Sequence, residues 1–382
     1  MSTFAALALC AAIAAIAAQA VTCVIAAWQC RPRRQEHATA QPPVTIIRPV
    51  CGIDHAAEET LGSTFSLAYP AYEIIFCVSD AADPVVPLVE RLIAANPGRP
   101  ARLLVGYSRY SFNPKLDNCA KGWEAARHDW IVMVDSNLLL RSDYLDRIMA
   151  RAGAWTGIVS APPIGGDARN FWAEVEAGIL NTYQARIQYA VDACGLGFAQ
   201  GKTLALRRSL LDRAGGYPAL GAEPAEDAAA TKAIRRLGLR VRLARPPCFQ
   251  PLGTRSARSV WDRQVRWARL RRATFPLLFA PEILSGPLAP LLLLGMASHQ
   301  AGWSPAPAII AFLMAWYACE AALARFAGWP LTWRSPMAWL LRDAAIPAVW
   351  FAACASRSFS WRGQSLEAAV TTPARPAINP AE

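Results

Sequence analysis

An apolar, charge-free run from Phe4 to Trp28 sets the first condition on the fold of this 382-residue chain. A run of this length can cross the hydrocarbon core of a bilayer, roughly 30 Å thick, as one helix. Arg31, Arg33 and Arg34 follow the run, and no positive charge precedes it. This order favours an uncleaved anchor whose C-terminal side lies in the cytoplasm. The alternative is a cleaved secretory signal, with small residues at 17–20 as its cleavage site.

The middle of the chain alternates strand-like and helix-like patterns. Strand candidates are 45–50, 73–80, 101–105 and 130–135, and helix candidates are 84–95 and 115–127. Such alternation predicts an α/β fold with a largely parallel sheet and helices on both faces. Ligands bind outside the carboxyl ends of the strands in these sheets. Asp80 and Asp135 each end a strand candidate, so we expect both at the ligand edge.

Apolar sequence returns towards the C-terminus. Charged residues make up only 18% of the chain, fewer than in a purely soluble protein, and the apolar excess gathers at the two ends. The runs 275–297 and 305–326 predict membrane segments, and four prolines predict that the first is kinked or re-entrant. The run 337–354 carries two charges and a proline, so it either spans or lies in the interface. From about Ala369 the Pro/Ala-rich tail predicts disorder.

The net charge of +11 does not predict a nucleic-acid partner. Arginines gather beside the apolar runs, at 31–34 and 263–272. Nucleic-acid binding would need them interleaved with aromatic residues over one surface. Their placement is typical of the positive-inside rule and of contact with anionic headgroups. The ten cysteines form no CxxC pair and the four histidines are dispersed, so we expect no structural zinc.

Two aspartates at strand ends are candidates for donor binding. Asp80 can accept hydrogen bonds from a nucleobase or a ribose, or it can simply cap a turn. Asp135 can bind Mg²⁺ or Mn²⁺, which prefer oxygen ligands and bridge to phosphates. Such a cation would neutralise a leaving diphosphate. Asn137 could add a carbonyl oxygen, and the alternative role for Asp135 is again a cap.

Two further motifs lie later in the chain. Glu226 and Asp227 open an Ala-rich helical stretch, where negative charge caps favourably. Asp227 is the candidate general base that deprotonates an acceptor hydroxyl. Arg263 and Arg266 share one helical face beside Trp267, which suits a phosphate and an aromatic platform. The alternative is a juxtamembrane basic helix that contacts lipid headgroups.

Taken in order, these residues resemble a known signature. Asp80, Asp135, Asp227 and Arg263-x-x-Arg266-Trp267 are similar to the D, D, D, (Q/R)xxRW pattern of processive and lipid-directed GT-A glycosyltransferases. The chain most resembles the ceramide glucosyltransferase-like family, glycosyltransferase family 21. The shorter motifs that carry the resemblance are 48–54, 69–73, 113–118, 134–137, 215–217, 225–227, 263–267 and 361–363.

The resemblance implies a cytoplasm-facing GT-A domain, a UDP-sugar donor, a divalent metal and inversion at the anomeric carbon. It implies nucleotide binding by Asp80, metal and diphosphate binding by Asp135, and base catalysis by Asp227. Arg266 and Trp267 would hold the diphosphate and close over the acceptor.

The resemblance also places Lys115 near the nucleotide pocket. Many GT-A enzymes have a DxD motif at the second site, whereas here Asn137 stands in the place of the last Asp. We therefore expect an altered metal ligand set.

The stretch Gly201-Lys202-Thr203, after Phe198-Ala-Gln, resembles the hopanoid-biosynthesis branch of the family. That branch transfers N-acetylglucosamine from UDP-N-acetylglucosamine to bacteriohopanetetrol. Animal ceramide glucosyltransferases are expected to have Cys-Val-Thr-Gly-Met there, and a histidine within 183–189. We therefore expect a hexosyltransferase acting on a hopanoid in the bilayer.

The alternatives are a ceramide glucosyltransferase that uses UDP-glucose and, more distantly, a non-catalytic lipid-binding protein. A polysaccharide synthase would need a longer transmembrane channel than these segments can form. The expected organisation is an anchor at 1–30, a cytoplasmic GT-A domain at 42–272, membrane or interfacial helices at 273–356, and a cytoplasmic tail at 357–382. The expected location is the bacterial inner membrane.

Overall fold

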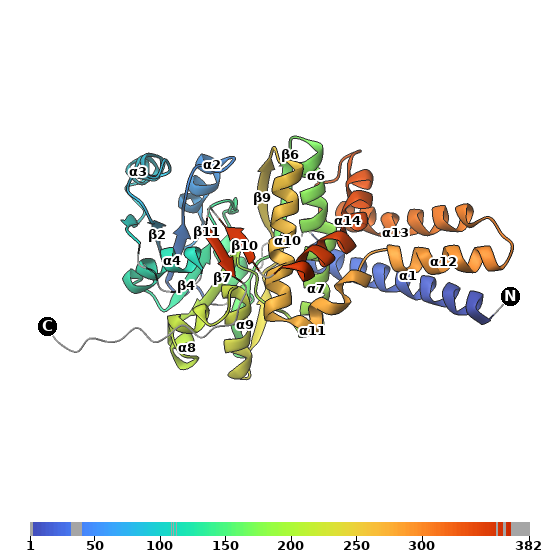
Figure 1. Ribbon diagram of the computed structural model, residues 1–382. Helices are drawn as coiled ribbons and strands as arrows, with labels where there is room; N and C mark the ends of the chain where they lie inside the picture. Colours follow the sequence, from blue (N-terminus) through green and yellow to red (C-terminus); the bar gives the residue numbers. More distant parts are fainter. Residues whose placement is uncertain are drawn as a thin grey trace.

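A seven-stranded sheet forms the centre of the α/β body (Figure 1). The computed structural model describes residues 3–31, 40–107, 109, 111, 113–356, 358–361 and 364–367. The strand order is β3-β2-β1-β4-β7-β5-β8. The strands are β1 (Val44–Pro49), β2 (Tyr72–Val78), β3 (Ala101–Val105), β4 (Trp130–Val134), β5 (Thr156–Ser160), β7 (Thr203–Arg207) and β8 (Arg240–Leu243).

The predicted largely parallel sheet is confirmed. Strands β3, β2, β1 and β4 run parallel to their neighbours, whereas β7 runs antiparallel to both β4 and β5. A small parallel pair, β6 (Pro163–Ala168) and β9 (Cys248–Gly253), and a hairpin, β10 (Ser358–Trp361) and β11 (Gln364–Glu367), complete the sheets.

Alternate side chains of the central strands enter two separate cores. Ile46, Ile74 and Val132 lie in the core on one face, and Ile47 and Ile75 lie in the core on the other. All five are fully buried, as expected for strands covered by helices on both sides. Because both faces are apolar, the strand patterns in the sequence were continuous and predicted these positions well.

Helices cover the sheet and extend beyond it. Around the sheet lie α2 (Ala57–Gly62), η1 (Ser63–Ser66), α3 (Val86–Ala95), α4 (Pro114–Ala125), α5 (Tyr144–Met149), α8 (Arg208–Arg213), η3 (Tyr217–Gly221) and α9 (Glu226–Arg236). Beside the small β6-β9 pair lie α6 (Phe171–Gly178), η2 (Ile179–Ala185), α7 (Arg186–Ala193) and α10 (Ala257–Thr274). Helices α3 and α4 confirm the predicted helices at 84–95 and 115–127.

A bundle of three apolar helices projects from one side of the α/β body (Figure 1). It consists of α1 (Thr3–Cys30), α12 (Leu288–Gln300) and α13 (Pro305–Ala327), which pack against one another. Helices α1 and α13, and also α14 (Ser335–Ala355), are long and apolar enough to cross a membrane. The segment Pro276–Leu284 (α11 and η4) meets α12 at an angle of 40°. The predicted kink in this proline-rich run is therefore confirmed.

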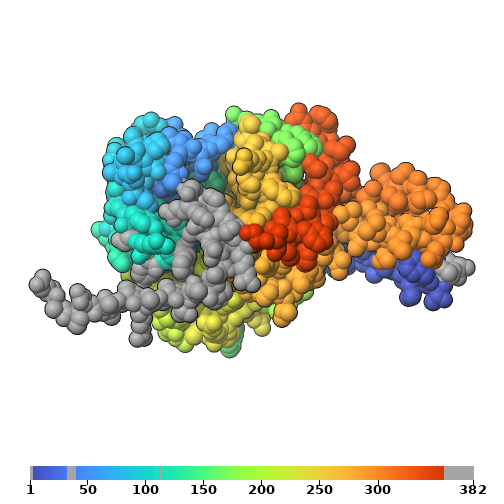
Figure 2. Space-filling view, in the orientation of Figure 1, coloured from blue at the N-terminus to red at the C-terminus, as the bar shows by residue number. Residues whose placement is uncertain are grey.

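Helix α14 packs mainly on α6 and α10 of the α/β body, and it also contacts α13 of the three-helix bundle through Arg342 and Glu320. Figure 2 shows the surfaces of α10 and α14 side by side. The outer face of α14 presents Met337, Leu340 and Phe351, all exposed, at helical spacing. Because α14 is also long and apolar enough to cross a membrane, both the spanning and the interfacial alternative for the run 337–354 stay predictions.

The two charges of α14 point inward. The guanidinium of Arg342 contacts the carboxylate of Glu320 on α13 at 2.8 Å and that of Asp343 at 2.7 Å. Gln19 on α1 donates to Glu320 over 3.0 Å. Buried charges are tolerated when they are paired and hydrogen-bonded. These polar groups join the bundle to α14 and leave the outer face of α14 apolar. Arg33, Arg34 and the predicted disordered tail lie outside the described residues.

Candidate functional site

The carboxylate of Asp135 lies between two lysines at the carboxyl end of β4. Its Oδ1 is 2.7 Å from Nζ of Lys115, and its Oδ2 is 3.0 Å from Nζ of Lys202. Burial alone would raise the pKa of Asp135, but the two ammonium groups outweigh burial and lower it to about 2. Asp135 is therefore a carboxylate at every physiological pH, held at the edge where ligands bind.

Arg48 holds the loop that carries Asp135 by hydrogen bonds to its main chain. This residue of β1 is fully buried. Its Nη2 donates to the main-chain oxygens of Asp135, at 2.9 Å, and of Ser136, at 3.0 Å. A planar guanidinium can hold several carbonyls at once, which a lysine cannot do. In the sequence, Arg48 is visible only as the first residue of the motif 48–54, and nothing local indicates this supporting role.

Lys115 connects Asp135 to a second carboxylate. It lies in the first turn of α4, which Asn113 caps by accepting from the amide of Lys115 over 3.0 Å. Nζ of Lys115 lies 2.8 Å from Oε1 of Glu226 and also donates to the main-chain oxygen of Gly201. Burial would lower the pKa of Lys115, but Asp135 and Glu226 raise it. Lys115 therefore stays charged and holds the loop, α4 and α9 together.

Asp227 follows Glu226 in the first turn of α9. Its Oδ2 accepts a hydrogen bond from the amide of Gly201 over 2.9 Å. Burial, and then the neighbouring charge of Glu226, raise the pKa of Asp227 to about 6. A carboxylate with such a pKa can accept a proton near neutral pH, as a general base must. A Cβ at position 201 would lie 2.7 Å from Oε1 of Glu226, so a larger residue there would require the Glu226 carboxylate to move.

Lys202 is the functional candidate that sequence reasoning missed. The resemblance used it only as a branch marker, yet its Nζ lies 3.0 Å from Oδ1 of Asn137 and contacts Asp135. The pairing of β4 with β7 explains this position. Val134 pairs with Thr203 in antiparallel register, so the next residues on each side, Asp135 and Lys202, face one another.

Asp80 lies at the same edge of the sheet, farther along. It follows β2, which is separated from β4 by β1. The side chain is exposed, and its Oδ1 accepts from the amide of Ala82 over 2.9 Å. This is the turn-capping contact that the sequence left open as the alternative. Nucleotide binding by Asp80 therefore stays a prediction.

The Arg-Trp motif on α10 packs against α6. Arg263 pairs with Glu176, a fully buried residue that also contacts Nε of Arg255 at 3.0 Å. Trp267 packs beside the apolar cluster of α6, which includes Ala177. Arg266, one turn after Arg263, lies on the same helix and is partly buried. The structure therefore brings Lys115, Asp135, Asn137 and Asp227 together, whereas Arg263 and Trp267 contact α6.

The basic residues after the motif have protein partners. Arg271 binds Glu282 through two hydrogen bonds of 2.7 and 2.9 Å. Arg269 donates to the main-chain oxygen of Ala352 over 3.2 Å, and Arg272 donates to that of Ala353. These carbonyls end α14, so the arginines of α10 cap it. Contact with lipid headgroups is therefore not needed to explain these arginines.

The oxygens of Asp135 and Asn137 fit a divalent cation. Oδ2 of Asp135 and Oδ1 of Asn137 both lie 3.0 Å from the same ammonium nitrogen, so they converge on one position that already attracts a cation. A carboxylate and an amide carbonyl, completed by phosphate oxygens, are ligands that Mg²⁺ accepts. Among the residues that the structure describes, no group of three or more His, Cys, Asp or Glu side chains is placed to hold a metal ion.

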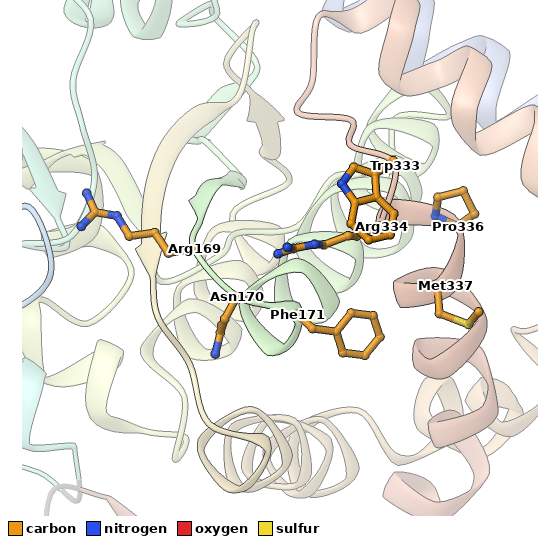
Figure 3. Close-up of a pocket in the computed structure, with 7 residues that line it drawn as sticks. All are labelled: Arg169, Asn170, Phe171, Trp333, Arg334, Pro336 and Met337. Atoms are coloured by element: carbon orange, nitrogen blue, oxygen red, sulfur yellow. The ribbon is translucent and has the colours of Figure 1, made fainter.

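A separate groove of about 790 Å³ lies between the start of α6 and the start of α14 (Figure 3). It is lined by Arg169, Asn170, Phe171, Trp333, Arg334, Pro336 and Met337. Trp333 and Arg334 reach towards α6 from the segment between α13 and α14 (Figure 3). The guanidinium of Arg334 lies 5.1 Å from the centre of the Trp333 ring. The groove therefore combines apolar walls with a cation, and it lies apart from the carboxylate cluster.

Comparisons with known proteins point to glycosyltransferases. The model of the family described as glycosyl transferase family 21 matches residues 7–373. The chain is 27% identical over 330 residues to ceramide glucosyltransferase 3 of Caenorhabditis elegans, covering 84% of this chain and 72% of that protein. It is 42% identical over 108 residues to a ceramide glucosyltransferase of Komagataella phaffii, covering 27% of this chain and 21% of that protein.

Solved structures with a similar fold include two bacterial or archaeal glycosyltransferases. A mannosyltransferase of Pyrobaculum calidifontis, in complex with GDP-Man and Mn²⁺, has a TM-score of 0.48 and 22% identity, covering 90% of this chain and 96% of that one. A glucosyl-3-phosphoglycerate synthase of Mycobacterium tuberculosis, in complex with Mn²⁺ and UDP-glucose, has a TM-score of 0.37 and 19% identity, covering 63% of this chain and 83% of that one.

Proposed function

Because the chain belongs to glycosyl transferase family 21 and is a hexosyltransferase, we propose that it moves a sugar from a UDP-sugar to a hydroxyl of a membrane lipid. The observation that carries this proposal is the pairing of two unlike carboxylates at one edge of the sheet. Asp135 is kept ionised by two lysines, whereas Asp227 has its pKa raised to about 6. Carboxylates whose pKa values are pushed apart suit different roles in one reaction.

Asp227 is the proposed general base. One of its oxygens takes the proton from the lipid hydroxyl, whose oxygen then attacks the anomeric carbon of the sugar. The new carbon–oxygen bond forms as the bond to the diphosphate breaks, so the configuration inverts and UDP leaves. The amide of Gly201, 2.9 Å from Oδ2 of Asp227, orients the carboxylate for this transfer.

The donor is proposed to lie along the carboxyl edge of the sheet. Asp80 would bind the nucleoside, and Lys115 would bind near it. Asp135 and Asn137 would hold a divalent cation, Mg²⁺ or Mn²⁺, which when bound neutralises charge on the leaving diphosphate.

Arg263, Arg266 and Trp267 would complete the donor site from α10. In the structure Arg263 pairs with Glu176, so this role requires the arginine to exchange one anionic partner for another. A guanidinium suits that exchange because it binds carboxylates and phosphates in the same fork geometry.

The proposed acceptor is a lipid with a free hydroxyl, and two lipids have support. The similarity to ceramide glucosyltransferases supports ceramide with UDP-glucose. The Gly201-Lys202-Thr203 stretch favours bacteriohopanetetrol with UDP-N-acetylglucosamine, but the similar ceramide glucosyltransferases give that branch no support. The ceramide alternative is therefore supported at least as well as the hopanoid.

The proposed organisation keeps the expected domains: anchor 1–30, GT-A domain 42–272, membrane and interfacial helices 273–356 and tail 357–382. The catalytic domain would lie on the cytoplasmic face of the inner membrane, because Arg31 follows the α1 anchor. A membrane-impermeant maleimide tests this orientation at the exposed Cys194. Labelling in inside-out vesicles supports it, and labelling only in right-side-out vesicles contradicts it.

Purified full-length protein in lipid nanodiscs tests the reaction itself. Labelled UDP-glucose and UDP-N-acetylglucosamine would each be offered with ceramide and with bacteriohopanetetrol, and the glycolipid would be identified by mass spectrometry. Transfer to neither lipid, with UDP and sugar staying joined, contradicts the proposed function. Asp227→Asn should abolish transfer and leave UDP binding nearly unchanged, whereas Asp212→Asn, at an exposed site on α8, should retain activity. Substantial turnover by Asp227→Asn contradicts the assignment of the base.

A further inference from the structure

Lys202 occupies the position at which oxygens of the donor site converge. Its Nζ lies 3.0 Å from Oδ2 of Asp135 and 3.0 Å from Oδ1 of Asn137. The main chain holds the lysine there, because the amide of Asp135 donates to the carbonyl of Lys202 over 3.1 Å. The side chain is largely buried, with 14% of its surface exposed. The Lys202 ammonium therefore contacts the two side-chain oxygens that would bind a metal, Oδ2 of Asp135 and Oδ1 of Asn137.

The two lysines at Asp135 differ in what holds them. Lys115 has a second carboxylate, Glu226, at 2.8 Å and also donates to the carbonyl of Gly201. Within the part of the chain that the structure describes, the Lys202 ammonium has Asp135 and Asn137 as its polar partners. Lys202 is therefore the lysine that can leave Asp135 while the rest of the cluster stays in place.

A divalent cation and the Lys202 ammonium compete for the same oxygens. Mg²⁺ binds oxygen ligands at about 2.1 Å and fills its coordination sphere, so an ammonium cannot keep hydrogen bonds of 3.0 Å to both ligands. Like charges at such short distance also repel strongly in a partly buried site. Metal binding must displace Lys202 from Asp135 and Asn137.

We propose that Lys202 is a built-in competitor that occupies the cation position of the donor-free protein and yields it when a nucleoside diphosphate arrives with the metal. The inference deepens the proposed function, because it assumes that Asp135 and Asn137 form the metal site. The diphosphate brings negative charge that the displaced ammonium can bind. The device makes metal binding depend on the donor, so that free protein holds the cation weakly and the donor complex holds it firmly.

Mn²⁺ binding to the purified full-length protein tests this coupling without any turnover. Free Mn²⁺ would be measured by electron paramagnetic resonance, with and without UDP. Lys202→Met keeps the side-chain length and removes the charge, so it should bind Mn²⁺ about tenfold more tightly than the wild type without UDP. Adding UDP should then tighten Mn²⁺ binding far less in Lys202→Met than in the wild type.

Three controls assign the effect. Lys202→Arg keeps the positive charge and should retain weak Mn²⁺ binding without UDP. Lys232→Met removes a lysine of α9 that pairs with Glu223 and contacts neither Asp135 nor Asn137, so it should match the wild type. Adding Asn137→Ala to Lys202→Met should remove the gain, because the cation then loses a ligand.

The proposal is overturned if Lys202→Met binds Mn²⁺ no more tightly than the wild type, or if Lys232→Met gains as much. Circular dichroism and the melting temperature show that each variant is folded. Sugar transfer is measured separately on the wild type. A protein that transfers no sugar but shows the Lys202-dependent Mn²⁺ effect refutes the proposed function and keeps this inference, whereas active protein without the effect does the reverse.

Discussion

Replacing Glu226 by Gln should move the acid limb of sugar transfer to lower pH. Burial and then the charge of Glu226 raise the pKa of Asp227 from 3.8 to about 6. A general base must be ionised, so kcat/KM should fall as the pH drops below about 6 in the wild type. Glu226→Gln removes the second cause and leaves burial, the larger one. The limb should therefore move down by at most about one pH unit.

The size of the effect follows from the ionised fraction of Asp227. At pH 5, a group of pKa about 6 is roughly 10% ionised, and a group of pKa about 5 is roughly 50% ionised. Activity at pH 5, relative to the plateau of the same variant, should therefore rise by up to about fivefold. The plateau itself should fall, because Lys115 loses its contact of 2.8 Å with a carboxylate. The shape of the profile, and not the absolute rate, carries the prediction.

The assay is kcat/KM for sugar transfer between pH 4.5 and 8 in nanodiscs, with each variant normalised to its own plateau. Glu223→Gln is the matched control, because Glu223 lies three residues earlier and pairs with Lys232. It should leave the limb where the wild type has it. An acid limb that stays in place in Glu226→Gln, or moves to higher pH, would refute the coupling between the two carboxylates.

Three other predictions concern Glu176, Lys115 and Asp227. Glu176→Ala leaves two arginines without their buried partner and should lower the free energy of unfolding by about 3 kcal/mol, measured by chemical denaturation. The control Asp262→Ala breaks an exposed ion pair and should lower the free energy of unfolding by less than about 0.5 kcal/mol. Lys115→Met should lower kcat by about 100-fold or more because the loop and α9 lose their connection, and activity within tenfold of the wild type contradicts this role. Because the pKa of Asp227 is raised, its protonation stabilises the folded state at low pH, and that stability is lost as the pH rises through about 6. Asp227→Asn should therefore raise the melting temperature more at pH 8 than at pH 5. An equal change at both pH values contradicts the raised pKa.

The sequence predicted the elements that local patterns determine. Strands β1, β2 and β4 are buried on both faces, so their apolar runs were continuous, and Asp135 was expected at the ligand edge because it follows β4. The carboxylate pair at the start of α9 was likewise visible as a helix beginning. Roles carried by the family resemblance, such as that of Asp80, remain proposals.

Contacts between distant segments could not be read from those patterns. Lys202 meets Asp135 because β7 enters the sheet antiparallel to β4, in a register that no local motif specifies. Glu176 belongs to no motif that the sequence suggested, yet it binds the first arginine of the Arg-Trp motif from 87 residues away. The arginines that follow were open to a headgroup interpretation because nothing local shows that they cap α14.

The capping of α14 by α10 couples an apolar surface to the Arg-Trp motif. Arg263 of α10 pairs with Glu176 of α6, and about two turns later Arg269 donates to the carbonyl of Ala352 near the end of α14. The outer face of α14 includes the exposed side chains of Met337 and Phe351. A shift of α14 is therefore passed to Arg263 through a single helix, so a substitution on the apolar face of α14 can alter the Arg-Trp motif without contacting it.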